Sequence, residues 1–598
     1  MAASTLIEMF LNTVANHGSK TAIMHKVEGQ YQGFSYHELG ERVKNFALGL
    51  ASLGVKKGDR VSILSENRPE WAISDLAILS LGAINVPIYP SLIPQQIEFI
   101  LNDSEAKLII TSNPDQTSKV VEILSDLPVL KNIIFMDQVS SKKENMLSFD
   151  RVLEKGKAWA EEKQDYYNEA TTNVLPDDAC GIVYTSGTTG NPKGAILSHN
   201  NILSNVKGGT TALRIGPEDT FLSFLPLCHV FERMAGHFCA LSQGSTIAYA
   251  ESIDTVAQNL GEVKPTIMTS VPRLFEKIYS RIIENAESGS PIKKKIFYWA
   301  FKTGEKYVNA MKKGKVGGVL QRKYNLAHKL VFSKIQERVG GRLRFFISGG
   351  APLPKEIGEF FHFAGIKILE GYGLTESSPV IAVNVEEKFK FGTVGPVLTS
   401  GDVEVKIADD GEVLTRGPHI MKGYYKKPAE TKEVIDKDGW LHTGDIGMLD
   451  EDGYLMITDR KKNIIVTSGG KNIAPAPIEN TLLTSPLIDQ ILIIGNKRKF
   501  LSALIVPNFE ILKSFAQENN INYNTNEELV NNPKIHQYVN NEVTRLSTDM
   551  ARFEQIKKFR LLAEVLAIET GELTPTLKIK RNVVEKKYAD LIESMYEM

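Results

Sequence analysis

The sequence CGIVYTSGTTGNPKGAIL, from Cys180 to Leu197, places two apolar runs on either side of a loop rich in glycine and hydroxyl groups. Both runs have the composition of short buried strands, so the segment is predicted to be a strand, a loop and a second strand. In the common phosphate-binding loop a second glycine and a lysine lead directly into a helix, but here Pro192 stands in place of that glycine. Ser198 is instead expected to cap a helix that begins after the second strand.

Such a loop can bind phosphate without a helix N-terminus beneath it. Its glycines expose backbone N–H groups, its hydroxyls add donors, and Lys193 supplies an ammonium group. The loop is therefore expected to close over a triphosphate and to open once pyrophosphate leaves. By itself the same composition also describes a flexible surface loop, so the interpretation depends on the rest of the chain.

Short apolar runs alternate with amphipathic segments through the first two thirds of the chain. The amphipathic segment PQQIEFILNDS (94–104) is typical of those between the runs. The runs predicted to be buried strands are AKLIITS (106–112), KNIIFMD (131–137), TIMTSVP (266–272) and LRFFISGGAP (343–352). This alternation predicts an α/β protein with largely parallel sheets.

The pattern changes after about Gly392. The segment GDVEVKIADDGEVLTRGP (401–418) has the alternation and the Asp-Gly turn of an antiparallel hairpin. Further on, the charged residues from Asp459 to Lys462 separate two apolar strands. A domain boundary is expected at this break, followed by a small α+β domain that reaches Met598.

Bulk composition excludes several classes of protein. With 598 residues, 42% hydrophobic and 24% charged, the chain is expected to form two or more globular domains. Its 70 basic and 71 acidic residues give no overall attraction to nucleic acid. The three cysteines (Cys180, Cys228, Cys239) have no metal-site spacing, and neither a secretory signal nor a spanning segment is recognised. We therefore expect a cytoplasmic protein, with contact at a membrane surface left open.

A basic segment from Pro291 to Arg338 stands apart from the rest. It contains thirteen Lys or Arg and only two acids, with the aromatic residues Phe297, Tyr298, Trp299 and Phe301 among them. Such a segment can rest on anionic lipid head groups, which would place the protein at the inner face of a membrane. It can equally be a solvated pair of helices whose aromatic side chains lie in the core. Nucleic-acid binding is disfavoured because no recognition motif accompanies the charge.

Six further motifs follow the glycine-rich loop in order. They are FLPLCHVFER (224–233), ISGGAP (347–352), EGYGLTESSP (370–379), GWLHTGDIG (439–447), DRKKNIIVTSGGKNI (459–473) and LTPTLKIKR (573–581). With YTSGTTGNPKG (184–194), this set resembles the adenylate-forming enzymes: acyl-CoA synthetases, peptide-synthetase adenylation domains and luciferases. The resemblance spans nearly the whole chain, and PLCHVFER, GYGLTESSPV, TPTLKIKR and the basic insertion are most similar to long-chain fatty acid–CoA ligases.

The resemblance implies a fold and a reaction. The fold is an α/β N-terminal domain of stacked sheets with a small β-barrel-like subdomain (1–458), a hinge (459–463) and a small mobile α+β C-terminal lid (464–598). In the reaction, a fatty carboxylate attacks the α-phosphate of ATP, and the thiol of coenzyme A then displaces AMP from the acyl-adenylate. ATP, Mg²⁺ and coenzyme A are the implied cofactors, a long-chain fatty acid is the implied substrate, and a homodimer is left open.

The resemblance also assigns roles to single residues. Lys578 is the implied catalytic lysine of adenylation, Lys193 the implied phosphate-loop lysine, and His229 lies between the carboxylate site and the acyl tunnel. Two oxygen donors, Thr185 and Glu376, are the implied magnesium ligands. The implied nucleotide-binding residues are Thr185, Ser186, Gly187, Thr188, Thr189, Gly190, Gly350, Ala351, Gly371, Tyr372, Thr375, Asp445 and Arg460, and those beside coenzyme A are Gly469, Gly470 and Lys471.

Within the nucleotide set, each group has its own implied contact. Asp445 binds the ribose hydroxyls, Arg460 reaches the ribose or a phosphate, and Gly350, Ala351, Gly371 and Tyr372 form the adenine pocket. The C-terminal domain is implied to swing at the charged break, so that Lys578 leaves and the turn from Ser468 to Lys471 faces the thiol.

Other functions remain open on the sequence. One is an acyl-adenylate enzyme with another acceptor, such as a carrier protein, although the SGGK turn favours coenzyme A. A medium-chain or other carboxylate–CoA ligase is a second, because one methylene is worth only about 1–3 kcal/mol to a pocket. A lipid-binding or scaffold protein with a degenerate nucleotide site is a third. A motor or signalling nucleotide hydrolase is disfavoured by the altered loop pattern.

Overall fold

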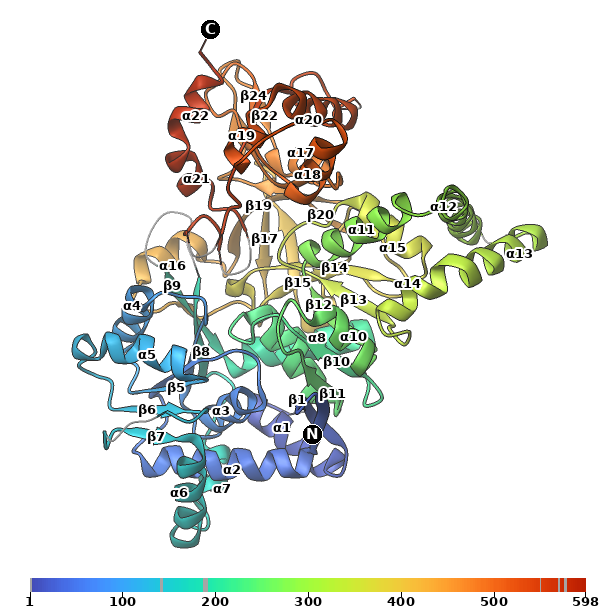
Figure 1. Cartoon of the computed structure of the whole chain (residues 1–598). Coiled ribbons are helices and arrows are strands. Elements are labelled where there is room, and N and C mark those ends of the chain that lie inside the picture. Colours follow the sequence, from blue (N-terminus) through green and yellow to red (C-terminus); the bar gives the residue numbers. More distant parts are fainter. Residues whose placement is uncertain are drawn as a thin grey trace.

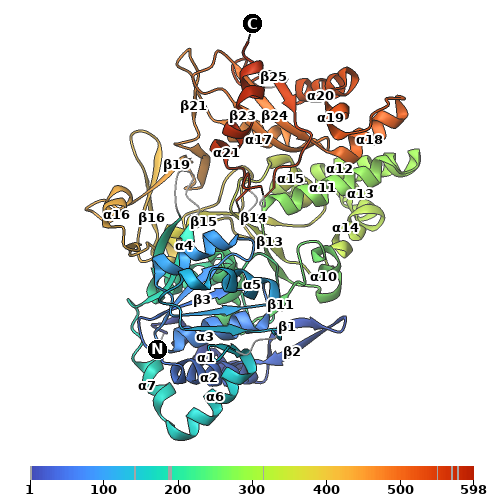
Figure 2. The same ribbon diagram turned by 60° about the vertical axis from the view of Figure 1, so that its left-hand side comes forward.

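The computed structural model describes residues 3–139, 143–185, 192–313, 315–548, 550–567, 570–574 and 578–597. Two eight-stranded sheets, a four-stranded sheet and a three-stranded sheet organise the described residues. The sheets follow one another along the chain, and the C-terminal domain lies over one end of the large N-terminal part (Figures 1 and 2). The α/β fold class expected from the alternating runs is confirmed.

The first eight-stranded sheet carries the glycine-rich loop. Its spatial order is β18-β9-β8-β4-β3-β5-β6-β7, parallel except at β9 and β18. The strands are β3 (Arg60–Leu64), β4 (Ile84–Ile88), β5 (Leu108–Thr111), β6 (Asn132–Phe135), β7 (Met146–Ser148), β8 (Ala179–Thr185), β9 (Lys193–Ser198) and β18 (Gly423–Tyr424). The helices between them are α2 (Tyr36–Ser52), α3 (Pro69–Ser80), α4 (Pro94–Ser104), α5 (Pro114–Glu122), the short η1 (Leu124–Asp126), α6 (Phe149–Glu162) and α7 (Tyr166–Thr172).

The second eight-stranded sheet supplies most of the remaining site segments. Its order is β15-β14-β13-β12-β10-β11-β1-β2, with parallel pairs from β14 to β1 and an antiparallel strand at each edge. The strands are β1 (Thr21–Val27), β2 (Gln30–Ser35), β10 (Thr220–Ser223), β11 (Thr246–Tyr249), β12 (Ile267–Ser270), β13 (Phe345–Ser348), β14 (Ile368–Gly373) and β15 (Val380–Val383).

Helices that accompany the second sheet divide into two groups. Those before β12 are α1 (Leu6–His17), α8 (His199–Leu213), the π-helical η2 (Glu232–Phe238), α9 (Cys239–Gln243) and α10 (Val256–Val263). Those after it are α11 (Pro272–Glu287), α12 (Pro291–Lys312), α13 (Gly318–Ala327), the π-helical η3 (His328–Phe332), α14 (Ser333–Arg338), α15 (Lys355–Phe363) and the short η4 (Thr375–Ser377). Ser198 caps α8 and accepts from the N–H of Asn201, as the sequence predicted.

A single hydrophobic cluster joins the two large sheets. Helix α3 is buried along its whole length and contacts strands of both sheets, β3 and β4 on one side and β1 on the other. Inside this core the Arg233 guanidinium pairs with Asp75, whose carboxylate also accepts from Asn85. A charge pair this deeply buried is stable only when its donors and acceptors are matched, so it fixes η2 against α3.

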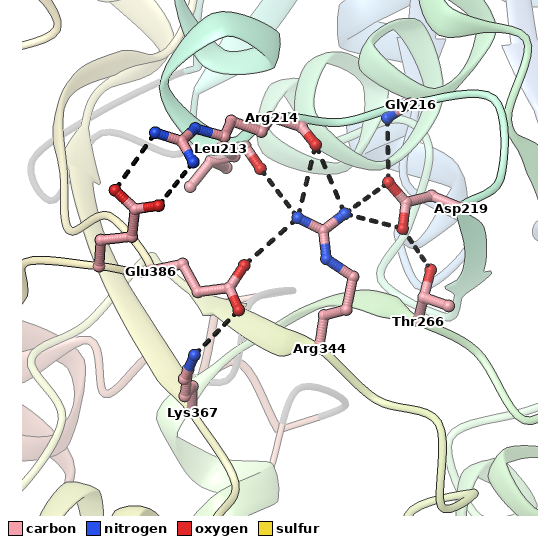
Figure 3. Close-up of polar contacts among 9 residues, drawn as sticks. Leu213, Arg214, Gly216, Asp219, Thr266, Arg344, Lys367 and Glu386 are labelled. Atoms are coloured by element: carbon pink, nitrogen blue, oxygen red, sulfur yellow. Dashed lines mark hydrogen bonds and ion pairs between the residues drawn. The ribbon is translucent and has the colours of Figure 1, made fainter.

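Arg344 holds together the amino ends of three strands in the second sheet. Its guanidinium donates to both carboxylate oxygens of the fully buried Asp219, at 2.9 and 2.7 Å, and to Glu386 at 3.3 Å (Figure 3). Asp219 also accepts from Thr266, at 2.7 Å. Since Asp219, Thr266 and Arg344 directly precede β10, β12 and β13, this network aligns the strands whose carboxyl ends carry the motifs.

The segment after the second sheet forms a four-stranded antiparallel sheet. Its strands, β16 (Glu404–Ile407), β17 (Glu412–Arg416), β19 (Leu441–Leu449) and β20 (Leu455–Arg460), pair in the order of the chain, with η5 (Thr399–Gly401) before them and α16 (Pro428–Val434) between β18 and β19. The Asp-Gly turn expected between the first two strands is present. Strand β20 runs through Asp459 and Arg460, so the charged break predicted from Asp459 begins inside a strand.

The C-terminal residues form a separate α+β unit with its own core. Strands β23 (Ile488–Ile494), β24 (Leu501–Pro507) and β25 (Ile556–Leu561) form its sheet, and β21 (Ile465–Val466) and β22 (Asn472–Ile473) form a hairpin. The helices are α17 (Pro475–Leu482), α18 (Phe509–Glu518), α19 (Asn526–Val530), α20 (Pro533–Leu546), α21 (Arg581–Lys587) and α22 (Ala589–Ser594). In the described part of the chain, no helix combines the length and apolar character needed to cross a bilayer.

Candidate active site

The two strands that hold the glycine-rich loop form an antiparallel pair. Strand β8 ends at Thr185, β9 begins at Lys193, and these two residues face each other in the register. The Thr185 hydroxyl donates to the Lys193 carbonyl at 3.4 Å, which closes the base of the loop. The expected phosphate-binding residues Ser186, Gly187, Thr188, Thr189 and Gly190 lie outside the described residues. The strand–loop–strand arrangement is therefore confirmed, and the loop's phosphate contacts stay a prediction.

Tyr424 connects the predicted phosphate lysine with a predicted metal ligand. It lies on β18, which pairs with β9 and brings its ring within 5.2 Å of the Lys193 ammonium, measured to the ring centroid. The Tyr424 hydroxyl donates to Glu376 at 2.7 Å. Burial holds the pKa of Tyr424 far above its usual value, so the hydroxyl remains a donor. Thr375 adjoins Glu376 in η4, so Tyr424 connects Lys193 with this short helix.

Sequence reasoning missed Tyr424, although a signal was present. The run GYYKKP, from Gly423 to Pro428, places two tyrosines beside two lysines, but nothing local shows that it returns to pair with β9. Because this pairing joins segments more than two hundred residues apart, only the fold could reveal the contact.

The fit to a metal ion is limited but consistent with magnesium. Thr185 and Glu376 offer a hydroxyl and a carboxylate, which are hard oxygen donors. Among the residues that the structure describes, no group of three or more His, Cys, Asp and Glu side chains is placed to bind a metal on its own. A donor set this small suits Mg²⁺ that is held mainly by nucleotide phosphates.

Asp445 lies at the centre of a second polar group. Its carboxylate accepts from the Tyr372 hydroxyl at 2.7 Å through one oxygen, and the other oxygen forms an ion pair with the Arg460 guanidinium at 3.1 Å. Its backbone N–H donates to Thr443 at 3.1 Å, which fixes the turn that presents it. Asp445 is buried while the Arg460 side chain is half exposed. The predicted ribose residue is therefore held in place by two other predicted site residues.

Two predicted adenine-pocket segments lie at the carboxyl ends of neighbouring parallel strands. Gly350 and Ala351 follow β13, and Gly371 and Tyr372 end β14, in a register that sets Ser348 opposite Glu370. Gly350 has a φ of +84°, a conformation that favours glycine. The Glu370 carboxyl accepts from the N–H of Leu353 and so joins the two segments, and burial raises its pKa to about 8. Ligands of open α/β sheets bind at this strand end.

Lys578, in the C-terminal unit, approaches the polar group of Asp445 and Arg460. Burial, and then the positive charge of Arg460, lower the pKa of the Lys578 ammonium to about 8, while the Asp445 carboxylate acts in the opposite direction. The side chain remains exposed to solvent, so water moderates the effect of burial. The effects of Arg460 and Asp445 on its pKa nevertheless place the ammonium near these two side chains. The backbone N–H of Lys578 donates to the Thr574 hydroxyl at 3.0 Å.

His229 is also within electrostatic reach of Lys578. Burial lowers the pKa of its imidazole to about 4, and the charge of Lys578 contributes in the same direction. Its Nδ1 accepts from the N–H of Phe231 at 3.1 Å, which leaves Nε2 as the protonated nitrogen of the neutral ring. Tyr89 packs edge-on at 6.4 Å between ring centroids. A neutral histidine with a free donor suits the predicted contact with a carboxylate.

The predicted coenzyme A residues lie in a hairpin turn of the C-terminal unit. Gly469, Gly470 and Lys471 form the turn between β21 and β22, where Gly470 has a φ of +75°. The contacts described for this turn are made to the C-terminal unit itself: Ser468 donates to the Arg498 carbonyl, and the Lys471 ammonium lies 5.8 Å from the Phe553 ring centroid. The structure thus brings Lys578 near the predicted nucleotide residues Asp445 and Arg460, whereas the contacts described for the SGGK turn stay within the C-terminal unit.

Comparison with known protein families identifies the family of this chain. The profile of the AMP-binding enzymes matches residues 10–425, and that of the AMP-binding enzyme C-terminal domain matches residues 462–598. The chain belongs to the AMP-binding enzymes. The second match begins in the charged segment between β20 and β21, and the two matches assign binding of an adenine nucleotide to this family member.

The sequence matches to relatives of this AMP-binding enzyme cover nearly its full length. A long-chain-fatty-acid–CoA ligase of Mycobacterium tuberculosis is 37% identical over 95% of this chain and 93% of its own. Long-chain-fatty-acid–CoA ligase 5 of Rattus norvegicus is 32% identical over 100% of this chain and 89% of its own. Among solved structures, the adenylation domain of a carboxylate reductase from Mycobacterium chelonae has a TM-score of 0.77 at 22% identity, covering 100% of this chain and 92% of its own. That structural likeness confirms the adenylate-forming fold.

Proposed function

We propose that this AMP-binding enzyme is an ATP- and Mg²⁺-dependent long-chain fatty acid–CoA ligase. The observation that carries the proposal is the position of Lys578, whose ammonium is close enough to interact electrostatically with the neutral His229 and with the Asp445–Arg460 pair. A lysine at this point can contact a carboxylate on one side and a nucleotide phosphate on the other. The names of the full-length relatives support a long-chain fatty acid as that carboxylate.

In the first half-reaction, a carboxylate oxygen attacks the α-phosphorus of ATP and the bond to pyrophosphate breaks. The reactants are both anions, so the barrier falls when cations and donors neutralise the developing charge. Lys578 bridges the two reactants, Lys193 and the glycine-rich loop bind the β- and γ-phosphates, and His229 donates from Nε2 to the carboxylate. Asp445 accepts from the ribose hydroxyls, and Arg460 is freed to reach the phosphate. A magnesium ion at Thr185 and Glu376 would supply further charge neutralisation.

In the second half-reaction, the sulfur of coenzyme A attacks the acyl carbon and AMP leaves with its phosphate. Lys578 stands where the thiol would approach, so the C-terminal unit is proposed to rotate and present Gly469, Gly470 and Lys471 instead. The polar contacts at the domain junction include the pairing of Lys461 with Asp410 and Glu412, the approach of Arg273 to Asp489 at 3.8 Å, and the bond from the Ala476 N–H to Asp459. The Lys461–Asp410 pair is exposed on both sides and contributes little, which supports rotation at residues 459–463.

Release of pyrophosphate and formation of thioester test the proposal separately. The purified chain is offered ATP, Mg²⁺ and palmitate, octanoate or benzoate, each with and without coenzyme A. We expect pyrophosphate with palmitate in both cases and palmitoyl thioester only with coenzyme A. Acyl-adenylate that persists in the presence of coenzyme A would favour another acceptor, such as a carrier protein, and preference for octanoate would favour a medium-chain ligase. Fatty-acid binding without pyrophosphate release would contradict an enzyme of either kind.

We also propose that the ligase works peripherally at the inner face of a membrane, because its substrate partitions into lipid. The homodimer stays a prediction from the sequence.

A further inference from the structure

The basic segment from Pro291 to Arg338 forms a helical arm, which we define as α12, α13 and η3. Figure 1 shows α13 extending away from the body of the molecule on the side of β13 and α14. Part of its aromatic content is internal, because Phe301 stacks on Phe360 at 4.2 Å and packs against Phe332. Tyr307 and Tyr324 stack at 3.8 Å and join α12 to α13. The arm is therefore a packed structure with one face inside and another outside.

The outer face of the arm carries exposed aliphatic side chains in a row. Val319 is 70% exposed, Leu326 50% and Leu330 39%. Their spacing of seven and then four residues places them on one side of a continuous helix. The same side exposes Arg322, Lys323 and Lys329 between them. A single exposed leucine is ordinary, but an ordered row of three on a projecting helix is not explained by packing.

The charge around this row has one sign. From residue 306 to 336 the chain has eight Lys or Arg and no Asp or Glu. In the part of the chain that the structure describes, Arg322, Lys323 and Lys329 form no ion pair, whereas Lys294 near the base of the arm pairs with Glu287. Since cations without acidic neighbours repel one another, an anionic surface is the partner that relieves this repulsion.

We infer that the outer face of α13 and η3 docks on an anionic lipid bilayer. Val319, Leu326 and Leu330 enter the boundary between head groups and acyl chains, and Arg322, Lys323 and Lys329 contact lipid phosphates. A nucleic acid would use the cations but not the aliphatic row, and an acidic protein would need a groove to receive it. The inference rests on the proposed function for its purpose, delivery of a membrane-borne acid, but its test measures binding alone.

Sedimentation with lipid vesicles tests the docking of the full chain. Vesicles of phosphatidylcholine are compared with vesicles that contain about one third phosphatidylglycerol, at low and at high salt. We expect binding to the anionic vesicles that weakens about tenfold or more at high salt, when the charges are screened. Equal binding to both vesicle types, or binding to an RNA oligonucleotide and not to vesicles, would overturn the inference.

Paired variants separate the arm from general surface effects. The double change Arg322→Glu with Lys323→Glu, and the double change Val319→Gln with Leu326→Gln, should each lower vesicle binding about tenfold or more. Their matched controls are Lys155→Glu with Lys157→Glu on α6, and the exposed Leu175→Gln, which should bind as the unchanged chain does. Thermal unfolding verifies that each variant is folded. Arm variants that bind as tightly as their controls would overturn the inference.

A ligase assay keeps this result distinct from the proposed function. Palmitate dispersed in detergent reaches the site without a bilayer, so the arm variants should release pyrophosphate at the rate of the unchanged chain. Failure of every protein in this assay would count against the ligase and leave the vesicle result standing. Lost vesicle binding with normal detergent activity is the outcome that both proposals require.

Discussion

Tyr424 is the residue at which two predicted roles meet. Its ring faces the ammonium of Lys193 and its hydroxyl donates to Glu376, so one side chain orients the predicted phosphate-binding cation and the predicted metal ligand together. Neither contact touches a reacting atom, and Tyr424 is therefore a positioning residue. Its two contacts can be removed one at a time, because phenylalanine keeps the ring and loses the hydroxyl.

Tyr424→Phe should change the magnesium dependence of pyrophosphate release more than it changes the stability of the folded protein. A hydrogen bond to a charged group contributes about 1.5–3 kcal/mol. If that energy orients Glu376, the Mg²⁺ concentration for half-maximal pyrophosphate release should rise about tenfold. Tyr424→Leu, which also removes the aromatic face from Lys193, should in addition raise the KM for ATP. Magnesium titration of both variants, with calorimetric binding of ATP as the second readout, checks this order; identical behaviour of the two would contradict it.

Lys578 gives a pH dependence whose direction follows from its lowered pKa. The productive form is the protonated one, and its pKa of about 8 means that charge is lost as the pH rises through that value. The kcat/KM for adenylation reports ionisation in the free enzyme, so it should fall above about pH 8. Arginine does not deprotonate in this range. In Lys578→Arg the kcat/KM for adenylation should therefore not fall above about pH 8, whatever activity the variant retains.

Lys578→Ala separates the two half-reactions. Pyrophosphate release should become undetectable, while thioester formation from supplied acyl-adenylate should persist. Equal loss of both activities would contradict rotation of the C-terminal unit, and an unchanged pH profile in Lys578→Arg would contradict the assignment of this pH dependence to Lys578.

Among the elements, the hairpin of β21 and β22 offers the sharpest test of the second half-reaction. A Cβ at Gly469 would lie 4.0 Å from the Thr467 hydroxyl, an ordinary contact distance, and Gly469 has no positive φ to strain Gly469→Val. Gly470→Val carries the extra strain of a positive φ. Both should slow thioester formation from supplied acyl-adenylate about tenfold or more if the turn lines a narrow passage, and Gly469→Val should leave pyrophosphate release unchanged. A defect confined to pyrophosphate release would count against this role.

Elements with a local pattern could be predicted from the sequence. The helix predicted from PQQIEFILNDS is α4, and the strand–loop–strand around Thr185 is β8 and β9, because period and turn chemistry are properties of adjacent residues. The pairing of β18 with β9 is long-range and could not be predicted. For the same reason the motifs could name Lys578 and Asp445, but only the fold could show that Tyr372 and Arg460 hold the Asp445 carboxylate.

At the scale of the whole molecule, the Arg344 network should matter for stability and not for chemistry. Arg344→Gln leaves the fully buried Asp219 without its main cation, and breaking such a pair costs about 3–5 kcal/mol. Arg214→Gln is the matched control, because its partner Glu387 is exposed and such pairs contribute at most about 1 kcal/mol. The melting midpoint of the N-terminal part should fall clearly in the first variant and little in the second. Equal midpoints would contradict the network's role.

Strand β18 has a consequence for how the protein is made. The loop after β8 is synthesised early, but the strand that brings Tyr424 beside it follows about 230 residues later. At 5–20 residues per second, a ribosome needs roughly 10 to 50 s to cover that interval. During this time the predicted phosphate loop lacks its contact with Tyr424, so that contact cannot orient Lys193 until β18 has emerged from the ribosome.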